Sequence, residues 1–496
     1  MRPGLVLLSG AILFMCTGIL TPKEMLEGFS NKGMITVALL FLVSEGVRRS
    51  GILEELLRRV LPQKRGESVF KIQFRMLPPV AFLSAFLNNT PVVVIFAPMV
   101  KRWAEKHGVS PTKLLIPLSF ATIFGGLCTL IGTSTNLVVH GMILDSGMEG
   151  FKMFELGKVG IIFAVLGLIY IFVVSPFLLP ERRENRDEAA IEEQQVQGLH
   201  RVEVVLGARF PAINKRIIDF DFTRKYGATI MEIRRSGQTY LIHDMRNEYF
   251  RNGDTLVLLA DDSFMANWGD SSFFLMVANG KDTEPQLGKH KRRLAILLLV
   301  LMIVGATVGE LPVVKEALPG VKLDMFFFVC IVTFIMAWLN IFPARKYTKY
   351  ISWDILVTIA AAFAISRAMQ NSGMADAVAA FAVNLSKNSS PVVLLGVIFI
   401  ITSTFTELMT NNAAAALCFP LSLSIAEHMG VSPMPFFVAI CIAASASFCT
   451  PIGYQTNLIV QGVGNYRFSD FVKIGLPLNI LALVVTVVFV PMFWPF

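Results

Sequence analysis

Long apolar stretches, separated by short polar segments, make up most of the chain. A helix needs about 20 apolar residues to cross a bilayer, and stretches of roughly that length recur along the sequence. They lie at residues 4–20, 32–47, 112–140, 157–179, 294–311, 325–342, 352–370, 433–463 and 472–494. The pattern predicts an α-helical polytopic membrane protein, whose first partner is the lipid bilayer.

One polar region interrupts this pattern. Residues 181–200 are dense in charge and predict a linker, and residues 201–280 contain short alternating runs such as RVEVVLG and GDTLVLLA. Alternation of this kind predicts strands, so we expect a small α+β domain. The order of YGATIMEIRRSG and FRNGDTLVLLA resembles the TrkA-C-like ligand-binding domain of regulators of potassium conductance. The resemblance implies a regulatory module with a small ligand, and a rigid spacer is the alternative.

Composition and charge agree with a membrane protein. Hydrophobic residues make up 54% of the chain and charged residues 16%, against about 25% charged in an ordinary soluble domain. The net charge is +8, but its basic residues cluster between apolar stretches, as at Arg58-Arg59 and Lys291-Arg292-Arg293. That placement is typical of cytoplasmic loops. We therefore expect no nucleic-acid partner, and a multi-pass protein of the inner (plasma) membrane with a cytoplasmic soluble domain.

The two halves of the chain are copies of one unit. SAFLNNTPVVVIFAP in the first half matches TELMTNNAAAALCFP in the second at an offset of 322 residues, as between Asn89 and Asn411 (411 − 89). Further on, CTLIGTSTNLVVHG matches CTPIGYQTNLIVQG at an offset of 321. We therefore expect one membrane repeat at residues 1–180 and another at residues 291–496, with the soluble domain inserted between them.

The repeats are predicted to cross the membrane in opposite directions. Arg75 and Lys101-Arg102 flank residues 76–100, which predicts a hairpin that enters and leaves from the cytoplasm. Counting crossings forward places the matching hairpin, residues 391–428, on the other side. Glycine-containing breaks interrupt the apolar helices that follow, at residues 112–140 and 433–463. Inverted repeats with broken helices and a site near the midplane are typical of secondary transporters.

Neutral polar side chains mark both hairpin tips and both helix breaks. The tips carry Asn88-Asn89-Thr90 and Thr410-Asn411-Asn412, and the breaks read GTSTN and GYQTN. Hydroxyl, amide and freed backbone oxygens suit a hard cation such as sodium, and N–H groups at helix N-termini suit an anion. Such residues also pair helices without further role, but their recurrence in register in both halves favours a binding site.

These motifs resemble those of the divalent anion:sodium symporter family, whose tips carry Ser-Asn-Thr. TELMTNNAAAALCFP and TPIGYQTNLIV resemble in particular its sulfate-permease-like branch. The resemblance implies sodium as the coupling ion, no organic cofactor, a homodimer, and an elevator-type motion of a transport domain against a scaffold. It implies sodium contacts from Ser84, Asn89, Gly132, Thr133, Thr406, Asn411 and Gly453. It implies substrate contacts from Asn88, Asn89, Thr90, Thr135, Thr410, Asn411, Asn412 and Thr456.

Departures from the family pattern narrow the range of expected substrates. Asn88 stands where the family has Ser, and Asn412 replaces a hydroxyl residue. Because the standard triplets accompany dicarboxylates, we expect sodium-coupled uptake of a smaller divalent oxyanion such as sulfate. Alternatives are a dicarboxylate symporter, an ion-linked antiporter that uses Glu407, and, from a different class, a membrane ligand sensor. No HExxH, GxSxG, CxxC or Walker-type motif stands out, so we expect no enzyme.

Overall fold

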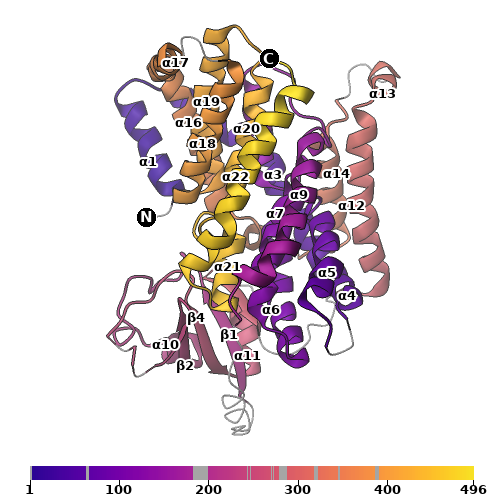
Figure 1. The fold of residues 1–496 in the computed structure, drawn as a ribbon, viewed down its shortest axis with the longest axis vertical. Coiled ribbons are helices and arrows are strands. Elements are labelled where there is room, and N and C mark those ends of the chain that lie inside the picture. The colour runs from indigo at the N-terminus through magenta and orange to yellow at the C-terminus, as the bar shows by residue number, and fades with distance from the viewer. Residues whose placement is uncertain are drawn as a thin grey trace.

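The protein is described from a computed structural model of the 496-residue chain (Figure 1). The structure describes residues 3–62, 66–181, 199–242, 244–245, 247–269, 271, 273–278, 287–317, 322–343, 347–385 and 390–496. The charged linker expected at residues 181–200 lies almost entirely outside the described residues.

Among the described residues of the first half, the regular elements are helices. They are α1 (Pro3–Cys16), α2 (Pro22–Glu27), the 3-10 turn η1 (Gly28–Ser30), α3 (Lys32–Arg49), α4 (Ile52–Val60), α5 (Val69–Ser84), α6 (Asn89–His107), η2 (Pro111–Lys113), α7 (Leu115–Gly126), α8 (Ser134–Asp145) and α9 (Gly157–Leu178). Helices α5 and α6 form the expected hairpin, and α7 and α8 are the two parts of the expected broken helix.

From α14 onward, the last part of the chain repeats this order. Its helices are α12 (Lys289–Gly309), α13 (Pro312–Ala317), α14 (Met325–Trp338), α15 (Tyr347–Tyr350), α16 (Trp353–Asn371), α17 (Met374–Leu385), α18 (Pro391–Leu408), α19 (Asn411–Met429), α20 (Met434–Ser445), α21 (Gln455–Gly464) and α22 (Phe468–Phe493). Here α18 and α19 form the hairpin and α20 and α21 the broken helix.

The backbone carries the same internal repeat as the sequence. Gly108 and Gly430 follow the last turns of α6 and α19 with φ of 72° and 67°. Gly51 and Gly373 do the same after α3 and α16, with φ of 71° and 70°. Glycine adopts this left-handed conformation at little cost, and it ends a helix there. Matching helices therefore stop at residues 322 apart.

The two hairpins enter the molecule from opposite ends. In Figure 1, α5 and α6 lie at the end that carries the strands, and α18 and α19 lie at the other end. The expected fold, a polytopic helical protein with inverted repeats, hairpins and broken helices, is confirmed. The division into domains at particular residues stays a prediction.

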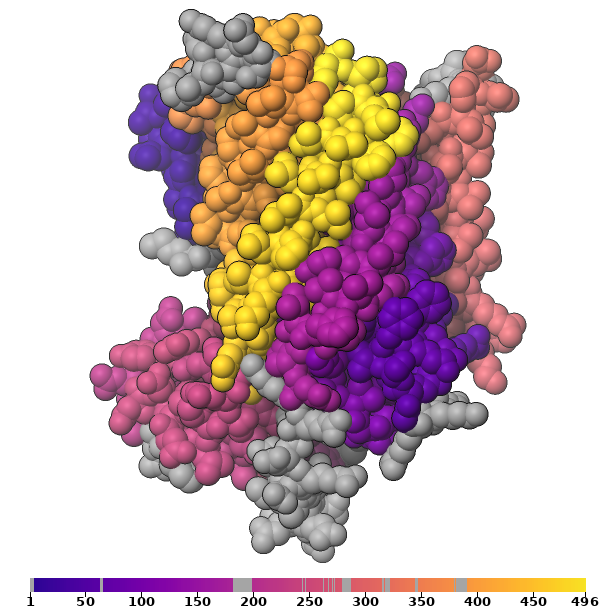
Figure 2. Space-filling view, in the orientation of Figure 1, coloured from indigo at the N-terminus to yellow at the C-terminus, as the bar shows by residue number. Residues whose placement is uncertain are grey.

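An apolar belt surrounds the long helices. Within the part of the chain that the structure describes, five helical segments are long and apolar enough to cross a membrane: Pro22–Arg49, Gly157–Leu178, Lys289–Gly309, Pro391–Leu408 and Phe468–Phe493. Exposed side chains on their surfaces are large and hydrophobic, as at Val173 on α9, Leu301 on α12 and Val484 on α22. Figure 2 shows α9 and α22 side by side across one face. An exposed apolar band of this kind suits contact with lipid.

In its described residues, the small domain contains a five-stranded antiparallel sheet and two short helices. Its elements are β1 (His200–Leu206), α10 (Phe222–Tyr226), β2 (Ala228–Arg235), β3 (Gln238–Leu241), β4 (Thr255–Ala260), α11 (Asp262–Trp268) and β5 (Phe274–Ala278), in the strand order β3-β2-β4-β1-β5. Val204, Leu256, Tyr226 and Phe264 share a core between one sheet face and the two short helices. The expected α+β insert is present, and its likeness to TrkA-C stays a prediction.

Candidate ion and anion site

Each hairpin tip contacts the helix break of the other repeat. At the first tip, Asn89 Nδ2 lies 2.6 Å from the Tyr454 hydroxyl, and Thr90 Oγ1 donates to Gln455 Oε1 at 3.4 Å. At the second tip, Asn412 Oδ1 accepts from Ser134 Oγ at 3.1 Å and from Thr135 Oγ1 at 3.3 Å. Each contact thus joins a tip of one repeat to the break of the other, across 365 positions at the first tip and 277 or 278 at the second, and neither repeat completes its polar site alone.

A cluster of oxygens surrounds Asn89. Its Oδ1 accepts from Ser84 Oγ at 2.7 Å. The same position lies 3.0 Å from the Thr122 carbonyl oxygen and 3.3 Å from the Gly132 carbonyl oxygen. These groups are buried, with Asn89 1% exposed and Ser84 fully covered. Three carbonyl-type oxygens this close repel one another unless a hydrogen or a cation lies among them.

The second repeat contains a matching cluster. Thr406 Oγ1 lies 2.9 Å from Asn411 Oδ1 and 2.6 Å from the Ala444 carbonyl oxygen. Thr406 precedes Asn411 by five residues, as Ser84 precedes Asn89. Ala444 lies in the last turn of α20, where carbonyl oxygens carry the partial negative charge of the helix end. Both clusters therefore offer neutral oxygen ligands beside a negative helix terminus.

Glycine allows the breaks to approach these clusters. A Cβ on Gly132 would lie 2.6 Å from the Gly126 carbonyl oxygen. A Cβ on Gly453 would lie 2.1 Å from Ser447 Oγ and 2.7 Å from the Thr406 carbonyl oxygen. Real side chains do not fit at such distances, so the two glycines predicted as sodium contacts are required for the local packing.

Two buried asparagines hold the break loops closed. Asn136 Nδ2 donates to the carbonyl oxygens of Gly126 and Thr129, at 3.3 and 2.9 Å. Asn457 Nδ2 donates to the equivalent carbonyls of Ser447 and Thr450, at 2.8 and 3.2 Å. Because these carbonyls lie outside regular helix, they need such partners when buried. The two breaks therefore share the same hydrogen-bond geometry.

Four helices begin at the site. Helices α6, α8, α19 and α21 start directly after the tips and breaks, and none of their N-cap side chains (Asn88, Thr133, Thr410 and Tyr454) accepts a hydrogen bond from its own first turn. The first N–H groups of a helix have no intrahelical partner and carry partial positive charge. Their convergence offers donors to an anion without a formal positive charge.

Orphaned hydroxyls accompany these helix ends. Within the described residues, Thr410 Oγ1 and Ser445 Oγ are buried with no hydrogen-bond partner. Thr410 is the N-cap of α19, and Ser445 adjoins Ala444 at the end of α20. Buried polar atoms of native proteins are normally paired. Two unpaired hydroxyls beside the second oxygen cluster therefore fit a site for a ligand.

The structure distributes the remaining predicted residues unevenly. Thr90, Thr135, Asn411 and Asn412 lie at the tips and breaks with the partners given above. Thr456 is instead turned to α7, where its hydroxyl accepts from Ser119 Oγ at 2.9 Å. Its backbone still belongs to the first turn of α21, so this position can contribute an N–H but its hydroxyl is already used.

Glu407 is held by three donors. Its carboxylate accepts from the Cys449 backbone N–H at 3.0 Å, Asn479 Nδ2 at 3.0 Å and Ser447 Oγ at 3.3 Å. The first repeat has Ala85 at this position. Glu407 thus ties the end of α18 to the second break and to α22, which gives the carboxylate a structural role.

Sequence reasoning missed Tyr454 and the Thr122 carbonyl. Tyr454 stands where the first repeat has Thr133, and a phenol within a tight polar turn was the available signal. It is 8% exposed, and its hydroxyl lies between Asn89 and Thr133 Oγ1, the latter at 3.3 Å. The Thr122 carbonyl could not have been found from residue types, because any residue supplies a backbone oxygen.

Comparison with known proteins assigns the family. The model of the citrate transporter family CitMHS matches residues 1–421 and 321–495. The chain belongs to this family. An uncharacterized transporter of Synechocystis is 30% identical, over 96% of this chain and 91% of that protein. A probable sodium/sulfate cotransporter of Chlamydomonas reinhardtii is 22% identical, over 94% of this chain and 83% of that protein.

A solved transporter has the same fold. The crystal structure of the YdaH transporter of Alcanivorax borkumensis superposes with a TM-score of 0.56 and 13% identity, over 99% of this chain and 98% of that chain. The expected kinship with the divalent anion:sodium symporters is confirmed by these matches. The protein is a membrane-embedded secondary transporter.

Proposed function

We propose that the protein couples sodium to the uptake of a small divalent oxyanion, with sulfate as the first candidate. The observation that carries this proposal is the crossed contact of two hairpin tips and two breaks, which gathers two oxygen clusters and four helix N-termini in one buried region. A probable sodium/sulfate cotransporter among the relatives supports the same pairing of ions.

The oxygen clusters fit sodium. Ser84 Oγ, Asn89 Oδ1 and the carbonyls of Thr122 and Gly132 would hold one ion, and Thr406 Oγ1, Asn411 Oδ1 and the Ala444 carbonyl would hold the other. Freed carbonyls at broken helices are the ligands that transporters use for sodium. The bound charge would favour an anion at the adjoining helix N-termini.

The anion site would rely on neutral donors. Thr90, Thr135, Asn411 and Asn412 are near the four helix starts and carry no formal charge. Neutral ligation allows release as well as binding, which transport requires. A compact tetrahedral oxyanion would contact several of these short donors at once.

Transport would require the crossed unit to move. Helices α5–α8 and α18–α21 are joined through the tips, while α3, α12 and α14 pack on one another (Figure 1). We propose an elevator-type motion of the crossed unit against these helices, in a homodimer of the inner membrane with the sheet domain on the cytoplasmic side.

Uptake of radiolabelled sulfate into proteoliposomes tests the proposal. We expect accumulation with an inward sodium gradient and little with an equal potassium gradient. Accumulation that ignores the sodium gradient would refute sodium coupling.

Citrate and related carboxylates are the second candidate, because the matching family is described by citrate transport. Unlabelled citrate and succinate added to the same assay separate the two substrates. Competition by carboxylates but not by thiosulfate or selenate would shift the assignment from oxyanion to carboxylate.

A further inference from the structure

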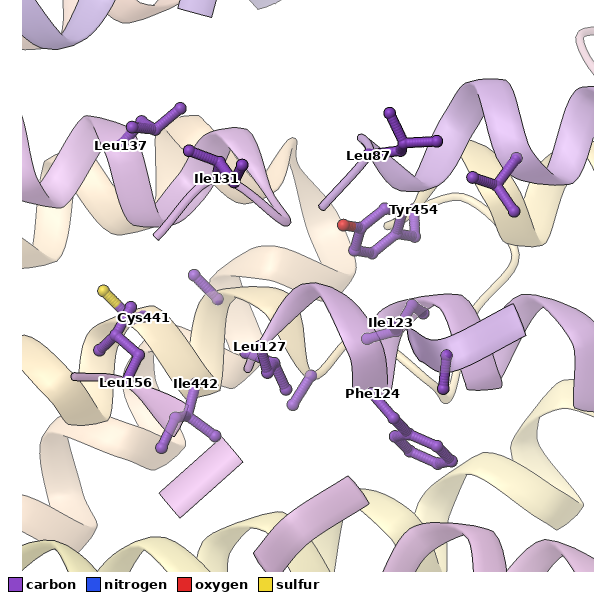
Figure 3. Close-up of a cluster of buried hydrophobic side chains, with 14 of the residues drawn as sticks. Leu87, Ile123, Phe124, Leu127, Ile131, Leu137, Leu156, Cys441, Ile442 and Tyr454 are labelled. Atoms are coloured by element: carbon purple, nitrogen blue, oxygen red, sulfur yellow. The ribbon is translucent and has the colours of Figure 1, made fainter. Parts of the chain in front are cut away.

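Tyr454 connects the two repeats at the first oxygen cluster. It comes from the second repeat, yet its hydroxyl lies 2.6 Å from Asn89 Nδ2 and 3.3 Å from Thr133 Oγ1 of the first. Figure 3 draws its ring among buried apolar side chains that include Leu87 and Ile123. The hydroxyl therefore has a fixed position and few alternative partners.

The amide of Asn89 has two orientations at this site, and only the rotated one satisfies both of its ends with protein atoms alone. With Oδ1 toward Ser84 and the carbonyls of Thr122 and Gly132, the amide nitrogen donates to the Tyr454 oxygen. When the amide is rotated, the nitrogen donates to Thr122, Ser84 and Gly132 at 3.0, 2.7 and 3.3 Å, and Oδ1 accepts from Tyr454 at 2.6 Å. In the first orientation Oδ1 faces the carbonyl oxygens, which suits a site that holds a cation. In the second orientation the amide N–H groups face the carbonyl oxygens, which suits a site without a cation.

The two orientations reverse the hydrogen bond at Tyr454. While Tyr454 accepts from Asn89, its own O–H is available to donate to Thr133 Oγ1, 3.3 Å away. While Tyr454 donates to Asn89, that proton is withdrawn from Thr133. Thr133 is the N-cap of α8, and the next residues, Ser134 and Thr135, hold Asn412 at the second tip.

We propose that Asn89, Tyr454 and Thr133 form a hydrogen-bond relay that makes anion binding depend on cation occupancy. The proposal rests on the sodium-coupled function above. Tyr454 is a positioning residue in this scheme: its O–H orients the Thr133 hydroxyl at the N-terminus of α8 only when the amide oxygen of Asn89 faces the cation cluster.

Binding measurements on purified protein with Tyr454→Phe test the relay. We measure sodium by the rise in melting temperature it causes, and sulfate affinity with and without sodium. The variant should keep the sodium-induced rise, while the factor by which sodium strengthens sulfate binding falls roughly three- to tenfold, the size of one hydrogen bond. Thr133→Val should reduce the same factor.

Tyr466→Phe is the matched control. Tyr466 is fully buried in the same repeat, donates to the Thr112 carbonyl at 2.6 Å and accepts from the Ile116 N–H at 3.2 Å. Its loss should leave the sodium factor unchanged. An unaltered factor in Tyr454→Phe would overturn the relay, as would loss of the sodium-induced rise, which would make Tyr454 part of the cation cluster. If the wild-type protein itself shows no sodium factor, the proposed function fails instead.

A second inference concerns the sheet face opposite the small domain's own core. Lys101 of α6 lies 2.9 and 3.2 Å from the two oxygens of Glu203 on β1, and Arg234 of β2 donates to Glu203 at 3.0 Å. Lys101 is 6% and Arg234 2% exposed. The sheet therefore covers the end of α6, and a largely buried ion triad joins the two.

The same face covers α21. A Cβ on Gly462 would lie 2.9 Å from both Thr255 Oγ1 and Val205 Cγ1, and the Gly237 N–H donates to Asn465 Oδ1 at 2.8 Å. Helices α6 and α21 begin at the first tip and the second break. Because a helix is a stiff rod with a rise of about 1.5 Å per residue, their held ends restrain the tips.

We infer that the docked sheet is a brake on transport. The restraint holds two helices of the crossed unit together, so it opposes separation of the first tip from the second break, and release of the triad should permit that separation. Removing one partner of a buried ion pair is strongly destabilising, so Glu203 is the residue whose loss should release the brake.

Opposite changes at the interface test the brake. Glu203→Gln should raise the maximal transport rate at least twofold with little change in KM. In a variant that carries both Thr255→Cys and Gly462→Cys, the oxidised, cross-linked form should transport more slowly than the reduced form of the same variant, a comparison that cancels any effect of the Cβ added at Gly462. Glu248→Gln, which neutralises an exposed carboxylate of the same domain, should change neither value. Unchanged rates in both the neutralised and the cross-linked protein would overturn the brake. Absence of transport in the wild-type protein would instead contradict the proposed function.

Discussion

Single neutral amides occupy the positions on which the site depends. Asn89 and Asn411 each accept from a hydroxyl five residues earlier in the chain, at 2.7 and 2.9 Å. The sequence repeat identified both residues, because polar residues recurred in register inside apolar stretches. It could not show the crossed pairing of tips and breaks, since contacts between residues more than 270 positions apart leave no periodicity in the chain.

Replacing either amide should stop transport while the fold survives. Asn89→Ala and Asn411→Ala each remove one oxygen from a cluster, and we expect uptake to fall at least tenfold because a hydrogen bond or ligand to a charged group contributes about 1.5–3 kcal/mol. Proteoliposome uptake and the elution profile in detergent are the measurements. Asn371→Ala, at an exposed asparagine, is the control. Wild-type uptake in both site variants would return the amides to a packing role.

Close approach of helices, rather than side-chain chemistry, sets the shape of the breaks. Gly160 of α9 lies against Leu127, and Gly475 of α22 lies against Phe448, the residues at the start of the two breaks. Added Cβ atoms would be 2.4 and 2.0 Å from the respective carbonyl oxygens. Sequence periodicity predicted α9 and α22 as spans, but it could not assign these glycines, because nothing local distinguishes them from other glycines in apolar helices.

Alanine at these glycines should destabilise the protein. Because backbone atoms cannot yield easily, Gly475→Ala should cost about 1–3 kcal/mol or more, and thermal unfolding in detergent should show a lower melting temperature. Gly396→Ala is the matched control, since a Cβ there meets Val487 at 3.6 Å, an ordinary contact. Equal melting temperatures for the two variants would contradict the packing argument.

Charge at the junction of the two parts of the molecule makes its stability depend on pH. Burial raises the pKa of Glu203, but the Lys101 ammonium and the Arg234 guanidinium outweigh it and hold the pKa at about 2, below the ordinary 4.5. A carboxyl whose pKa is lowered on docking stabilises the docked state above its undocked pKa. That contribution is lost as the pH falls from about 4.5 toward 2.

The melting temperatures of the wild-type protein and Glu203→Gln should therefore differ fully only above that pH range. We expect the difference between their melting temperatures to be constant from about pH 5.5 to 8 and to shrink below about pH 4.5. Using the difference cancels other groups that titrate in both proteins. A difference that already shrinks between pH 7 and 6 would show that another group controls docking.

At the scale of the whole molecule, a polytopic helical membrane protein, its two repeats and its insert were all predictable, because hydropathy and internal similarity report them directly. The docking of the sheet on α6 and α21 was not predictable, since Lys101 and Glu203 read as ordinary surface charges when taken singly. Only their joint burial in the folded chain shows the triad.

The crossed pairing of tips and breaks also affects how the protein folds and assembles. Severed between residues 181 and 199, the chain would yield two fragments, each with a tip whose partner resides on the other fragment. Such fragments should transport nothing when produced separately and regain function when produced together. A nascent chain must likewise wait for α21 to emerge before its earliest tip can reach Tyr454.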